Sequence, residues 1–571
     1  MKSHKVINKA ENLPTVRDYL NSAIKKYAKN NAFIIKNKEG KEVTYTNITY
    51  EKFGKQMKSL GTALIKLGLE NKRIAVIGKN CYEWVLAFSA TLSGVGVSVP
   101  LDRGLQENEI VMSIQRSKAD AIVFEAEFSE IMDRIRKENS TNIKHFICMN
   151  SNKNKENLYL YDLIKEGEKL LKNKDKKFEE HKIDPEELAS IVFTSGTTSL
   201  SKAVMLSHKN IASQIYNINA CEKIYDTDVN LAFLPLHHTF GSTAILLFLA
   251  DGVTNVFCDG LRHIQENLKE YKVSIFVCVP LLLESMHKKI MLQVDKQGKT
   301  KLIKFGRKLS RFLLKFKIDI RRKLFKQILD QLGGNIRFVI SGAAALDKEV
   351  ESALNDFGIL AVQGYGLTET APVLAAENEE NMKYGSIGLP MPEVEIKIDN
   401  PNEEGIGELI AKGPNIMMGY YEMEEETNQV LKDGWFHTGD LGYIDKDGFI
   451  FITGRKKNVI VLKNGKNIYP EEIETMIAKL PYVAENMVFG KEKDEDLLVS
   501  VKIVYNEEYV KEKYGDISEE DLRQLIWNDI KEINKTMPTY KYIKNLVITK
   551  EPMIKTTTAK IKRFEEIKKE K

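Results

Sequence analysis

The sequence predicts an α/β fold: a large amino-terminal domain of mostly parallel sheets with flanking helices, then a small carboxyl-terminal α/β domain. Between residues 73 and 366, short β-branched apolar runs alternate with helical segments, which is typical of parallel strands buried between helices. From about residue 385, apolar and polar residues alternate around Asp-Gly turns, as in antiparallel strands. A short αβ pattern returns after Gly454 and predicts the second domain.

Ten apolar runs are the expected strands of the parallel region: 74–78, 97–101, 121–125, 145–150, 189–196, 231–236, 254–259, 274–280, 336–342 and 359–366. Residues 243–250 are the most apolar stretch. We expect a core helix there, because a membrane span needs about 18 apolar residues. Ligands bind beyond the carboxyl ends of parallel strands, so motifs that follow these runs are candidate site residues.

The remaining elements follow the same patterns. The expected antiparallel strands are 394–399, 407–413 and 443–453. In the second domain we expect helices from about 470 and at about 518–535, strands at 483–490, 497–504 and 542–549, and a Lys-rich end, 551–571, that is loose at its tip. We place the boundary in GRKKN (454–458), which divides the chain into 1–454 and 455–571.

The composition of the 571 residues excludes several classes of protein. The 43% hydrophobic and 29% charged residues are typical of a globular chain, and a net charge of +5 is too small for a nucleic-acid-binding polycation. There are five cysteines and no CxxC pair, and the amino terminus has no apolar core. These features favour a reduced, cytoplasmic protein without a disulfide framework, a cysteine zinc site or a signal peptide.

Positive charge is concentrated in residues 287–327. This segment has fifteen Lys and Arg against two Asp, a charge of +13, which leaves about −8 for the rest of the chain. Apolar residues recur in it at helical spacing, so it is compatible with peripheral contact at an anionic inner membrane surface. It is equally compatible with a hairpin packed on the domain with a solvated basic face, or with a surface that steers an anionic substrate.

Residues 194–202, TSGTTSLSK, are the first chemical motif. Seven of the nine are Ser, Thr or Gly, and Lys202 ends the motif before an expected helix. Small hydroxyl residues and glycine let N–H and hydroxyl groups converge on a phosphate, and lysine adds positive charge. The spacing is not that of a Walker A loop. An ordinary Ser/Thr-rich turn is the alternative.

Three further motifs are weak signals separately. GYGLTET (364–370) offers glycines for close backbone approach and, at Glu369, a carboxylate suited to Mg²⁺, although a buried turn would look the same. Asp440 and Arg455 end successive turns, where they would clamp a ribose diol or form a structural salt bridge. Lys560 lies in a Thr-rich segment near the carboxyl end, where a solvated basic tail is the alternative.

Together, the four motifs resemble the adenylate-forming superfamily of acyl-CoA synthetases, peptide-synthetase adenylation domains and beetle luciferases. TSGTTSLSKAVMLSH (194–208) is similar to the family pattern TSGTTGxPKGxxxSH, and GYGxTE, TGD and GRxK are met at 364–369, 438–440 and 454–457. The resemblance implies two sheets plus a small β-barrel in the large domain and a mobile lid that carries the catalytic lysine. It also implies ATP, Mg²⁺ and coenzyme A as cofactor and co-substrates.

The resemblance implies a role for each matching residue. Glu369 would bind Mg²⁺, Thr368 the α-phosphate, and Lys560 would bridge the substrate carboxylate and the α-phosphate. Lys457 matches the hinge, Gly465 the pantetheine tunnel, and His238 a gate beside the carboxylate, with a satisfied core histidine as its alternative. The nucleotide would be held by Thr194, Ser195, Gly196, Thr197, Thr198 and Lys202 at the β- and γ-phosphates, by Gly342, Ala343, Ala344, Tyr365 and Gly366 at the adenine, and by Asp440 and Arg455 at the ribose.

The chain departs from the family pattern at four positions. Ser199, Ser201 and Ala203 replace Gly, Pro and Gly, and Ala559 replaces the glycine before Lys560. Each would be strained if its backbone had to be left-handed, at about 1 kcal/mol. We expect slower or differently regulated chemistry rather than loss of activity.

The basic insertion at about 285–330 resembles the long-chain fatty acyl-CoA synthetases, so we expect a long- or medium-chain fatty acid as substrate. Transfer to an acyl carrier protein instead of coenzyme A is one alternative. A non-catalytic nucleotide- or lipid-binding relative is another. Nucleic-acid binding is disfavoured, because the basic segment has no aromatic stacking pattern.

Overall fold

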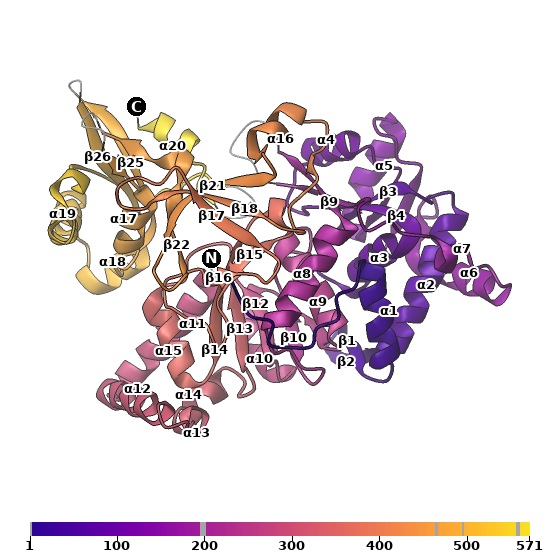
Figure 1. The fold of residues 1–571 in the computed structure, drawn as a ribbon, viewed down its shortest axis with the longest axis horizontal. Coiled ribbons are helices and arrows are strands. Elements are labelled where there is room, and N and C mark those ends of the chain that lie inside the picture. The colour runs from indigo at the N-terminus through magenta and orange to yellow at the C-terminus, as the bar shows by residue number, and fades with distance from the viewer. Residues whose placement is uncertain (1–2, 195–200, 463–465, 494–495, 556–559, 571) are drawn as a thin grey trace.

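The computed structural model describes residues 3–194, 201–462, 466–493, 496–555 and 560–570. The chain forms two large sheets, a smaller antiparallel sheet and a second domain (Figure 1). This architecture confirms the predicted α/β fold.

The first large sheet has the strand order β19-β9-β8-β4-β3-β5-β6-β7. The six strands from β8 to β7 in this order run parallel. Strand β9 is antiparallel to β8, and β19 is antiparallel to β9. The strands are β3 (Lys72–Ile77), β4 (Gly96–Leu101), β5 (Ala121–Phe124), β6 (His145–Cys148), β7 (Leu158–Tyr159), β8 (Leu188–Phe193), β9 (Ala203–Ser207) and β19 (Gly419–Tyr420). Its main helices are α2 (Tyr50–Lys66), α3 (Tyr82–Ala90), α4 (Glu107–Ser117), α5 (Ser129–Glu138) and α6 (Leu160–Lys172).

The second large sheet has the order β16-β15-β14-β13-β12-β10-β11-β1-β2. Its centre is parallel, and antiparallel strands border it at both edges. The strands are β1 (Asn31–Glu39), β2 (Glu42–Thr49), β10 (Val229–Ala232), β11 (Thr254–Phe257), β12 (Ile275–Cys278), β13 (Phe338–Ser341), β14 (Leu360–Gly366), β15 (Val373–Ala376) and β16 (Leu389–Pro390). All ten predicted parallel runs therefore contain strands.

Helices α8 (His208–Cys221) and α9 (Thr239–Ala250) lie between the two large sheets (Figure 1). The side chains from Ile245 to Leu249 are at most 1% exposed, so α9 is buried on all sides. An evenly apolar helix needs such a place, and the predicted core helix is confirmed. Among the described residues, none of the helices combines the length and apolar character required to cross a membrane.

The antiparallel unit is a five-stranded sheet made of β17 (Glu395–Asp399), β18 (Gly407–Lys412), β20 (Leu431–Lys432), β21 (Trp435–Ile444) and β22 (Ile450–Arg455). The order is β17-β18-β21-β20, with β22 paired to β21, so the ladders between the described strands do not close into a ring. Helix α16 (Glu424–Val430) precedes β20.

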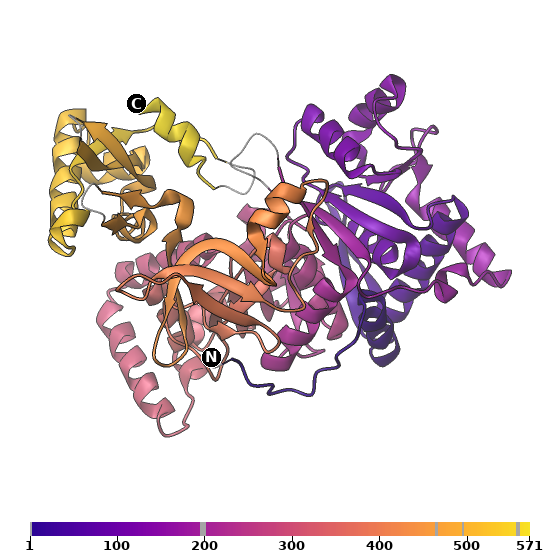
Figure 2. The same ribbon diagram turned by 45° about the horizontal axis from the view of Figure 1, so that its top comes forward.

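The second domain stands at one end of the molecule, beside the antiparallel sheet (Figures 1 and 2). Strand β26 (Asp496–Tyr505) pairs antiparallel with β25 (Val483–Lys493) and parallel with β27 (Asn545–Thr549). Helices α17 (Pro470–Ile477), α18 (Glu507–Tyr514) and α19 (Glu519–Lys535) supply its core together with the sheet. The predicted helices and strands of this domain are present.

Two local expectations were wrong. Lys202 is followed by strand β9 rather than directly by a helix, and α8 begins only at His208. The end of the chain contains helix α20 (Arg563–Lys569) instead of a loose tail. Helix α20 is anchored by the fully buried Glu566: burial disfavours its charge, but the Ile554 N–H and the Lys502 and Lys569 ammonium groups outweigh burial and lower its pKa to about 2.

Candidate active site

The end of strand β14 lies against the β21–β22 hairpin. Asp440 and Arg455 are direct partners in this hairpin, and Arg455 Nε lies 2.7 Å from Asp440 Oδ1. The Tyr365 hydroxyl donates to Asp440 Oδ2 at 2.6 Å. Burial raises the pKa of Asp440, and Arg455 and the Tyr365 hydroxyl partly oppose that shift. The pair is more than a surface salt bridge, because Asp440 is held by partners from two sheets.

The polar ends of the phosphate-loop motif approach Glu369. The Thr194 N–H donates to the Lys202 carbonyl at 2.9 Å, which brings the two ends of residues 195–200 together. The Lys202 ammonium lies 4.4 Å from the centroid of the Tyr420 ring, and the Tyr420 hydroxyl donates to Glu369 Oε1 at 2.9 Å. Burial and Glu369 raise the pKa of Tyr420, so it remains a hydroxyl donor. Tyr420 thus connects the lysine to the carboxylate.

Lys560 reaches the same place from the second domain. Its side chain is solvent-exposed, but protein atoms surround it closely enough that desolvation lowers the pKa of its amine. Arg455 lowers that pKa further, whereas Asp440 and Glu369 raise it. The charge of Lys560 therefore interacts with those of Arg455, Asp440 and Glu369, which favours its predicted place in the site over a solvated tail.

His238 borders this cluster at the start of α9. Burial, then the neighbouring His237 and Lys560, lower the pKa of His238 to about 4, so the ring is neutral at pH 7. Its Nε2 atom lies 3.1 Å from His237 Nε2, which in turn lies 3.5 Å from Asp102 Oδ2. A neutral ring beside a lysine can lie against a substrate without adding charge.

The proposed adenine turn follows strand β13. The Gly342 N–H donates to the Cys278 carbonyl at 3.0 Å, and a Cβ on Gly342 would lie 3.1 Å from the Phe240 ring. Ala343 has a φ of +71°, and both Ala343 and Ala344 are exposed. A Cβ on Gly366 would lie 1.7 Å from the Pro372 carbonyl oxygen, so only glycine is accommodated there.

Two of the four departures from the family pattern lie in described residues. Ser201 and Ala203 have no left-handed backbone, and Ala203 lies in strand β9. Neither is strained by the loss of the family residue. Among the predicted site residues that the structure describes, Ala343 in the adenine turn is the non-glycine residue with a left-handed backbone. Ser195, Gly196, Thr197, Thr198, Ser199, Gly465 and Ala559 lie outside the described residues.

Lys457, the expected hinge residue, lies in the turn Lys456–Asn458 directly after β22. Desolvation and the charge of Arg455 lower the pKa of its amine, with smaller contributions from Lys202 and Lys560. The adjacent Lys456 Nζ lies 2.8 Å from the nearly buried Glu408. A second contact between the domains joins Lys479 Nζ and Asp347 Oδ2 at 3.2 Å.

The sequence reasoning missed three polar residues around this cluster: Tyr420, His237 and Asp102. Tyr420 directly follows residues 415–419, NIMMG, and no motif used in the sequence analysis covers this segment. Asp102 directly follows the predicted strand 97–101. Its place at a strand end was a usable signal, because strand ends border the crevice.

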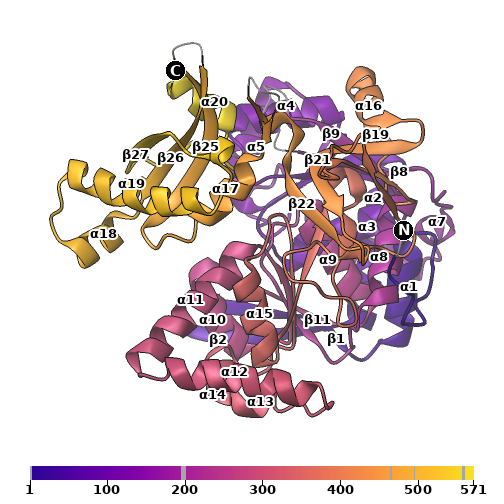
Figure 3. The same cartoon turned by 60° about the vertical axis from the view of Figure 1, so that its left-hand side comes forward.

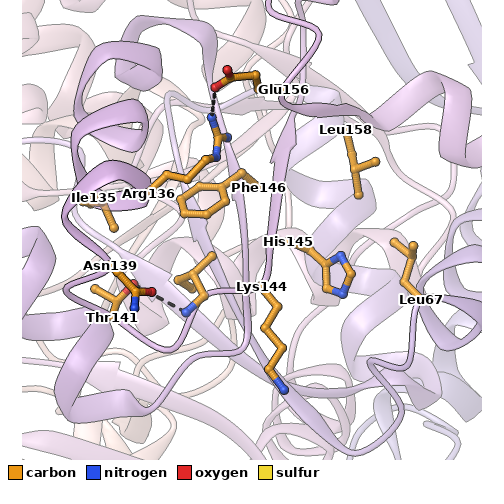
Figure 4. Close-up of a pocket in the computed structure, with 11 residues that line it drawn as sticks. Leu67, Ile135, Arg136, Asn139, Thr141, Lys144, His145, Phe146, Glu156 and Leu158 are labelled. Atoms are coloured by element: carbon orange, nitrogen blue, oxygen red, sulfur yellow. Dashed lines mark hydrogen bonds and ion pairs between the residues drawn. The ribbon is translucent and has the colours of Figure 1, made fainter.

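A cavity of about 470 Å³ lies elsewhere, along α5 and β6 (Figure 4). None of the predicted site residues lines it. Its Arg136 is paired with Glu156 at 3.0 Å and lies 4.5 Å from the Phe146 ring centroid, so the charge of Arg136 is already matched within the protein.

Strand ends, a buried aspartate paired with an arginine, a carboxylate and lysines from two domains are the groups expected of a nucleotide-binding enzyme. The sequence matches the family described as AMP-binding enzyme over residues 21–421, and the AMP-binding enzyme C-terminal domain over 457–569. The chain belongs to the AMP-binding enzyme family.

Named relatives and solved structures agree with this assignment. Fatty acyl-CoA synthetase B of Dictyostelium discoideum is 30% identical over 508 residues, which cover 83% of this chain and 75% of the relative. Long chain acyl-CoA synthetase 2 of Arabidopsis thaliana is 28% identical over 542 residues, 86% of this chain and 79% of the relative. The anthranilate CoA ligase AuaEII in complex with anthranoyl-AMP has the same fold, with a TM-score of 0.74 at 19% identity and 97% coverage of both chains.

Proposed function

We propose that the chain is an ATP-dependent fatty acyl-CoA synthetase. It activates a long- or medium-chain fatty acid to an acyl-adenylate with release of pyrophosphate, and then transfers the acyl group to coenzyme A with release of AMP. The observation that supports this most directly is the position of Lys560, which reaches Glu369, Asp440 and Arg455 from the second domain. The names of the relatives support the choice of acid and acceptor.

In this proposal the Asp440–Arg455 pair holds the ribose, with Asp440 accepting from its hydroxyl groups. The turn Gly342–Ala344, the Tyr365 ring and the backbone at Gly366 contact the adenine. Thr194, Lys202 and residues 195–198 hold the β- and γ-phosphates, and Thr368 donates to the α-phosphate. The proximity of Lys202 to Tyr420 and Glu369 supports this placement of the phosphates.

Glu369 is the residue that would hold Mg²⁺. Its Oε1 accepts from Tyr420, and no other hydrogen bond to its carboxylate occurs among the described residues, so Oε2 can serve as a ligand. A magnesium ion commonly takes one or two carboxylates and completes its shell with phosphate oxygens and water. When bound, it would neutralise part of the triphosphate charge.

The acid oxygen attacks the α-phosphorus, and the bond to the pyrophosphate oxygen breaks. A carboxylate and a triphosphate repel each other, so cations between them are required. In this proposal the Lys560 ammonium contacts both the carboxylate and the α-phosphate and stabilises the charge of the transition state. The neutral His238 ring would border the acid without adding positive charge.

We propose residues 1–454 and 455–571 as the two domains, with rotation at Lys457 after adenylation. That rotation would withdraw Lys560 and bring the segment with Gly465 toward the pantetheine of coenzyme A. The thiolate of coenzyme A then attacks the acyl carbonyl, and AMP leaves. The contacts of Lys456 and Lys479 with the large domain would hold the arrangement in which Lys560 is in the site.

The test is pyrophosphate release with Mg-ATP and acids from acetate to oleate, each with and without coenzyme A. We expect release that depends on a long acyl chain and turns over only with coenzyme A, and we expect Lys560→Ala to abolish it. Release without coenzyme A turnover would favour a carrier-protein acceptor. Nucleotide binding without release for any acid would contradict the enzyme proposal and favour a non-catalytic relative.

A further inference from the structure

Helix α12 (Thr300–Leu314) is attached to the protein largely through polar groups. Arg307 Nε and Arg311 Nε each lie 2.7 Å from the carboxylate of Asp356, on α15 (Lys348–Phe357), and that carboxylate side chain is only 5% exposed. The buried residues of α12 are Gly306 and Ser310, and the half-buried Ile303 packs against the core of the large domain. A helix on a globular domain usually buries its apolar face. In α12, ion pairs to a buried carboxylate help to hold the helix, and a second apolar row stays outside.

The outer face of α12 and the turn after it form an apolar row. Leu302, Phe305, Phe312 and Phe316 are 62%, 64%, 56% and 62% exposed. Leu309, which is half-buried, completes the three- and four-residue spacing that puts them on one side of a helix. Four exposed aromatic or aliphatic side chains in one row are a contiguous patch, unlike single exposed apolar residues.

A basic row runs beside the apolar one. Four of the five apolar residues are directly preceded by a lysine: Lys301, Lys304, Lys308 and Lys315. Residues 300–318 contain no Asp or Glu. We call the nine residues of the two rows the α12 face.

The α12 face is at the periphery of the molecule. Helix α12 lies at the edge of the large domain in two views, away from the second domain and with α13 (Arg321–Leu324) next to it (Figures 1 and 3). Helix α11 (Pro280–Lys296) connects it to the site: α11 starts two residues after Cys278, whose carbonyl accepts from Gly342. At 1.5 Å per residue, α11 spans about 25 Å.

We propose that the α12 face docks the protein on an anionic phospholipid bilayer. The apolar side chains would enter the boundary between headgroups and acyl chains, and the basic row would contact the headgroup phosphates. An apolar row beside a basic row is complementary to an anionic bilayer, which has an apolar interior beneath negatively charged headgroups. A second copy of this chain is a poor occupant, since pairing two α12 faces would bring two rows of lysines together.

If the proposed function is right, docking has a direct consequence for the substrate. Long-chain fatty acids partition into bilayers, so an enzyme on the bilayer meets a higher local concentration of its acid. Docking itself needs neither ATP nor acid. It can therefore be tested separately from catalysis.

The experiment is sedimentation of the full chain with phosphatidylcholine vesicles, with or without phosphatidylglycerol, and without ATP. We expect binding to the anionic vesicles only, weakening as salt is raised. Replacing Lys301, Lys304, Lys308 and Lys315 by Gln should weaken binding at least about 100-fold, since each lysine contributes roughly fivefold. Phe305→Ser with Phe312→Ser should weaken it at least about tenfold.

Matched controls separate the α12 face from general charge and apolarity. Phe564→Ser removes a ring with the same exposure, 63%, from helix α20. Lys511, Lys513, Lys531 and Lys535, all exposed in the second domain, are changed to Gln as the charge control. These controls should bind vesicles like the unaltered chain. Thermal unfolding of each variant shows that it is folded.

Three outcomes would overturn the proposal: no binding of the unaltered chain to anionic vesicles, equal loss in the controls, or a concentration-dependent dimer that Phe305→Ser and Phe312→Ser abolish. The last would assign the face to a second copy. Pyrophosphate release with a long-chain acid kept below its solubility limit, measured without vesicles, reports on the proposed function alone. The two proposals can thus fail independently.

Discussion

The protonation state of Lys560 predicts how the proposed reaction depends on pH. Desolvation and Arg455 lower the pKa of its amine below the ordinary lysine value, so the ammonium loses its proton at a lower pH than an exposed lysine would. In our proposal adenylation needs the ammonium, so kcat/KM for pyrophosphate release should fall as pH rises through that lowered pKa. Bound ATP favours the charged form, so the fall in kcat should come at higher pH.

Two arginine variants test this assignment. Lys560→Arg keeps the charge to higher pH, so it should lower the rate but move the alkaline limb of the profile upward. Lys457→Arg is the control, because the pKa of the Lys457 amine is also lowered although we place this residue at the hinge. An unchanged alkaline limb in Lys560→Arg would mean that another group limits the rate.

Ala343 makes a prediction about stability. Its φ of +71° lies in the left-handed region, which costs a non-glycine residue about 1–2 kcal/mol. Glycine loses more backbone entropy on folding than alanine does, and this loss offsets part of the strain that Ala343→Gly would relieve. Ala343→Gly should therefore raise the free energy of unfolding by about 0.5–1 kcal/mol, measured by thermal unfolding. The neighbouring Ala344 has no positive φ, so Ala344→Gly should give no increase; equal effects would contradict the strain argument.

Single residues were predictable where a motif carried them. Asp440, Arg455, Glu369 and Lys560 were named from sequence, and the structure brings them together. Tyr420 could not be named in this way, because it reaches Glu369 only through the pairing of β19 with β9, two segments more than 200 residues apart. Residues that act through such long-range pairing have no local signal.

At the scale of elements, the ion pair in the turn after β22 leads to a prediction about the arrangement of the two domains. Lys456 Nζ lies 2.8 Å from Glu408, a carboxylate with 8% exposure that also accepts from the Gly439 N–H and contacts His437. Lys456→Ala should loosen the segment after β22 and disfavour the arrangement in which Lys560 is in the site. We expect adenylation to slow about three- to tenfold, which corresponds to roughly 1 kcal/mol.

The second half-reaction separates this effect from general damage. Thioester formation from preformed acyl-adenylate should be no slower in Lys456→Ala, since it does not need Lys560 in the site. Lys446→Ala, an exposed lysine in the β21–β22 turn, is the control and should leave both steps unchanged. Equal slowing of both half-reactions by Lys456→Ala would show that the ion pair stabilises the fold without selecting an arrangement.

Elements were predictable from periodicity where a run was long enough to have one. Buried β-branched runs marked ten of the parallel strands, and alternation marked β17 and β18. The expected strand 443–453 was wrong in its bounds, because it spans the turn between β21 and β22. Strand β9 was missed because its five residues directly follow the Ser/Thr-rich motif and directly precede a helix. Helix α20 was missed because its sequence is mostly charged; one buried carboxylate, Glu566, fixes it through partners on β26 and in residue 554, which no local pattern shows.

At the scale of the whole molecule, one site must support two chemical steps. In our proposal, Lys560 serves adenylation in the present arrangement of the domains, and the thiol of coenzyme A must later approach the same acyl carbon. We therefore expect the second domain to move between the two steps. Its contact through Lys479 and Asp347 would then break in each catalytic cycle.

A cross-link at this contact tests that requirement. In the native ion pair, Lys479 Nζ lies 3.2 Å from Asp347 Oδ2. In a variant with Asp347→Cys and Lys479→Cys, a short bifunctional maleimide should therefore fix the present arrangement of the domains. The cross-linked enzyme should still release about one pyrophosphate per molecule, because Lys560 stays in place, but it should form almost no acyl-CoA. The same variant before cross-linking controls for loss of the ion pair. Each single cysteine variant after treatment controls for reaction at the native cysteines, of which Cys81 and Cys258 are partly exposed. Full acyl-CoA turnover in the cross-linked enzyme would show that one domain arrangement serves both half-reactions, and the role we give to Lys457 would be wrong.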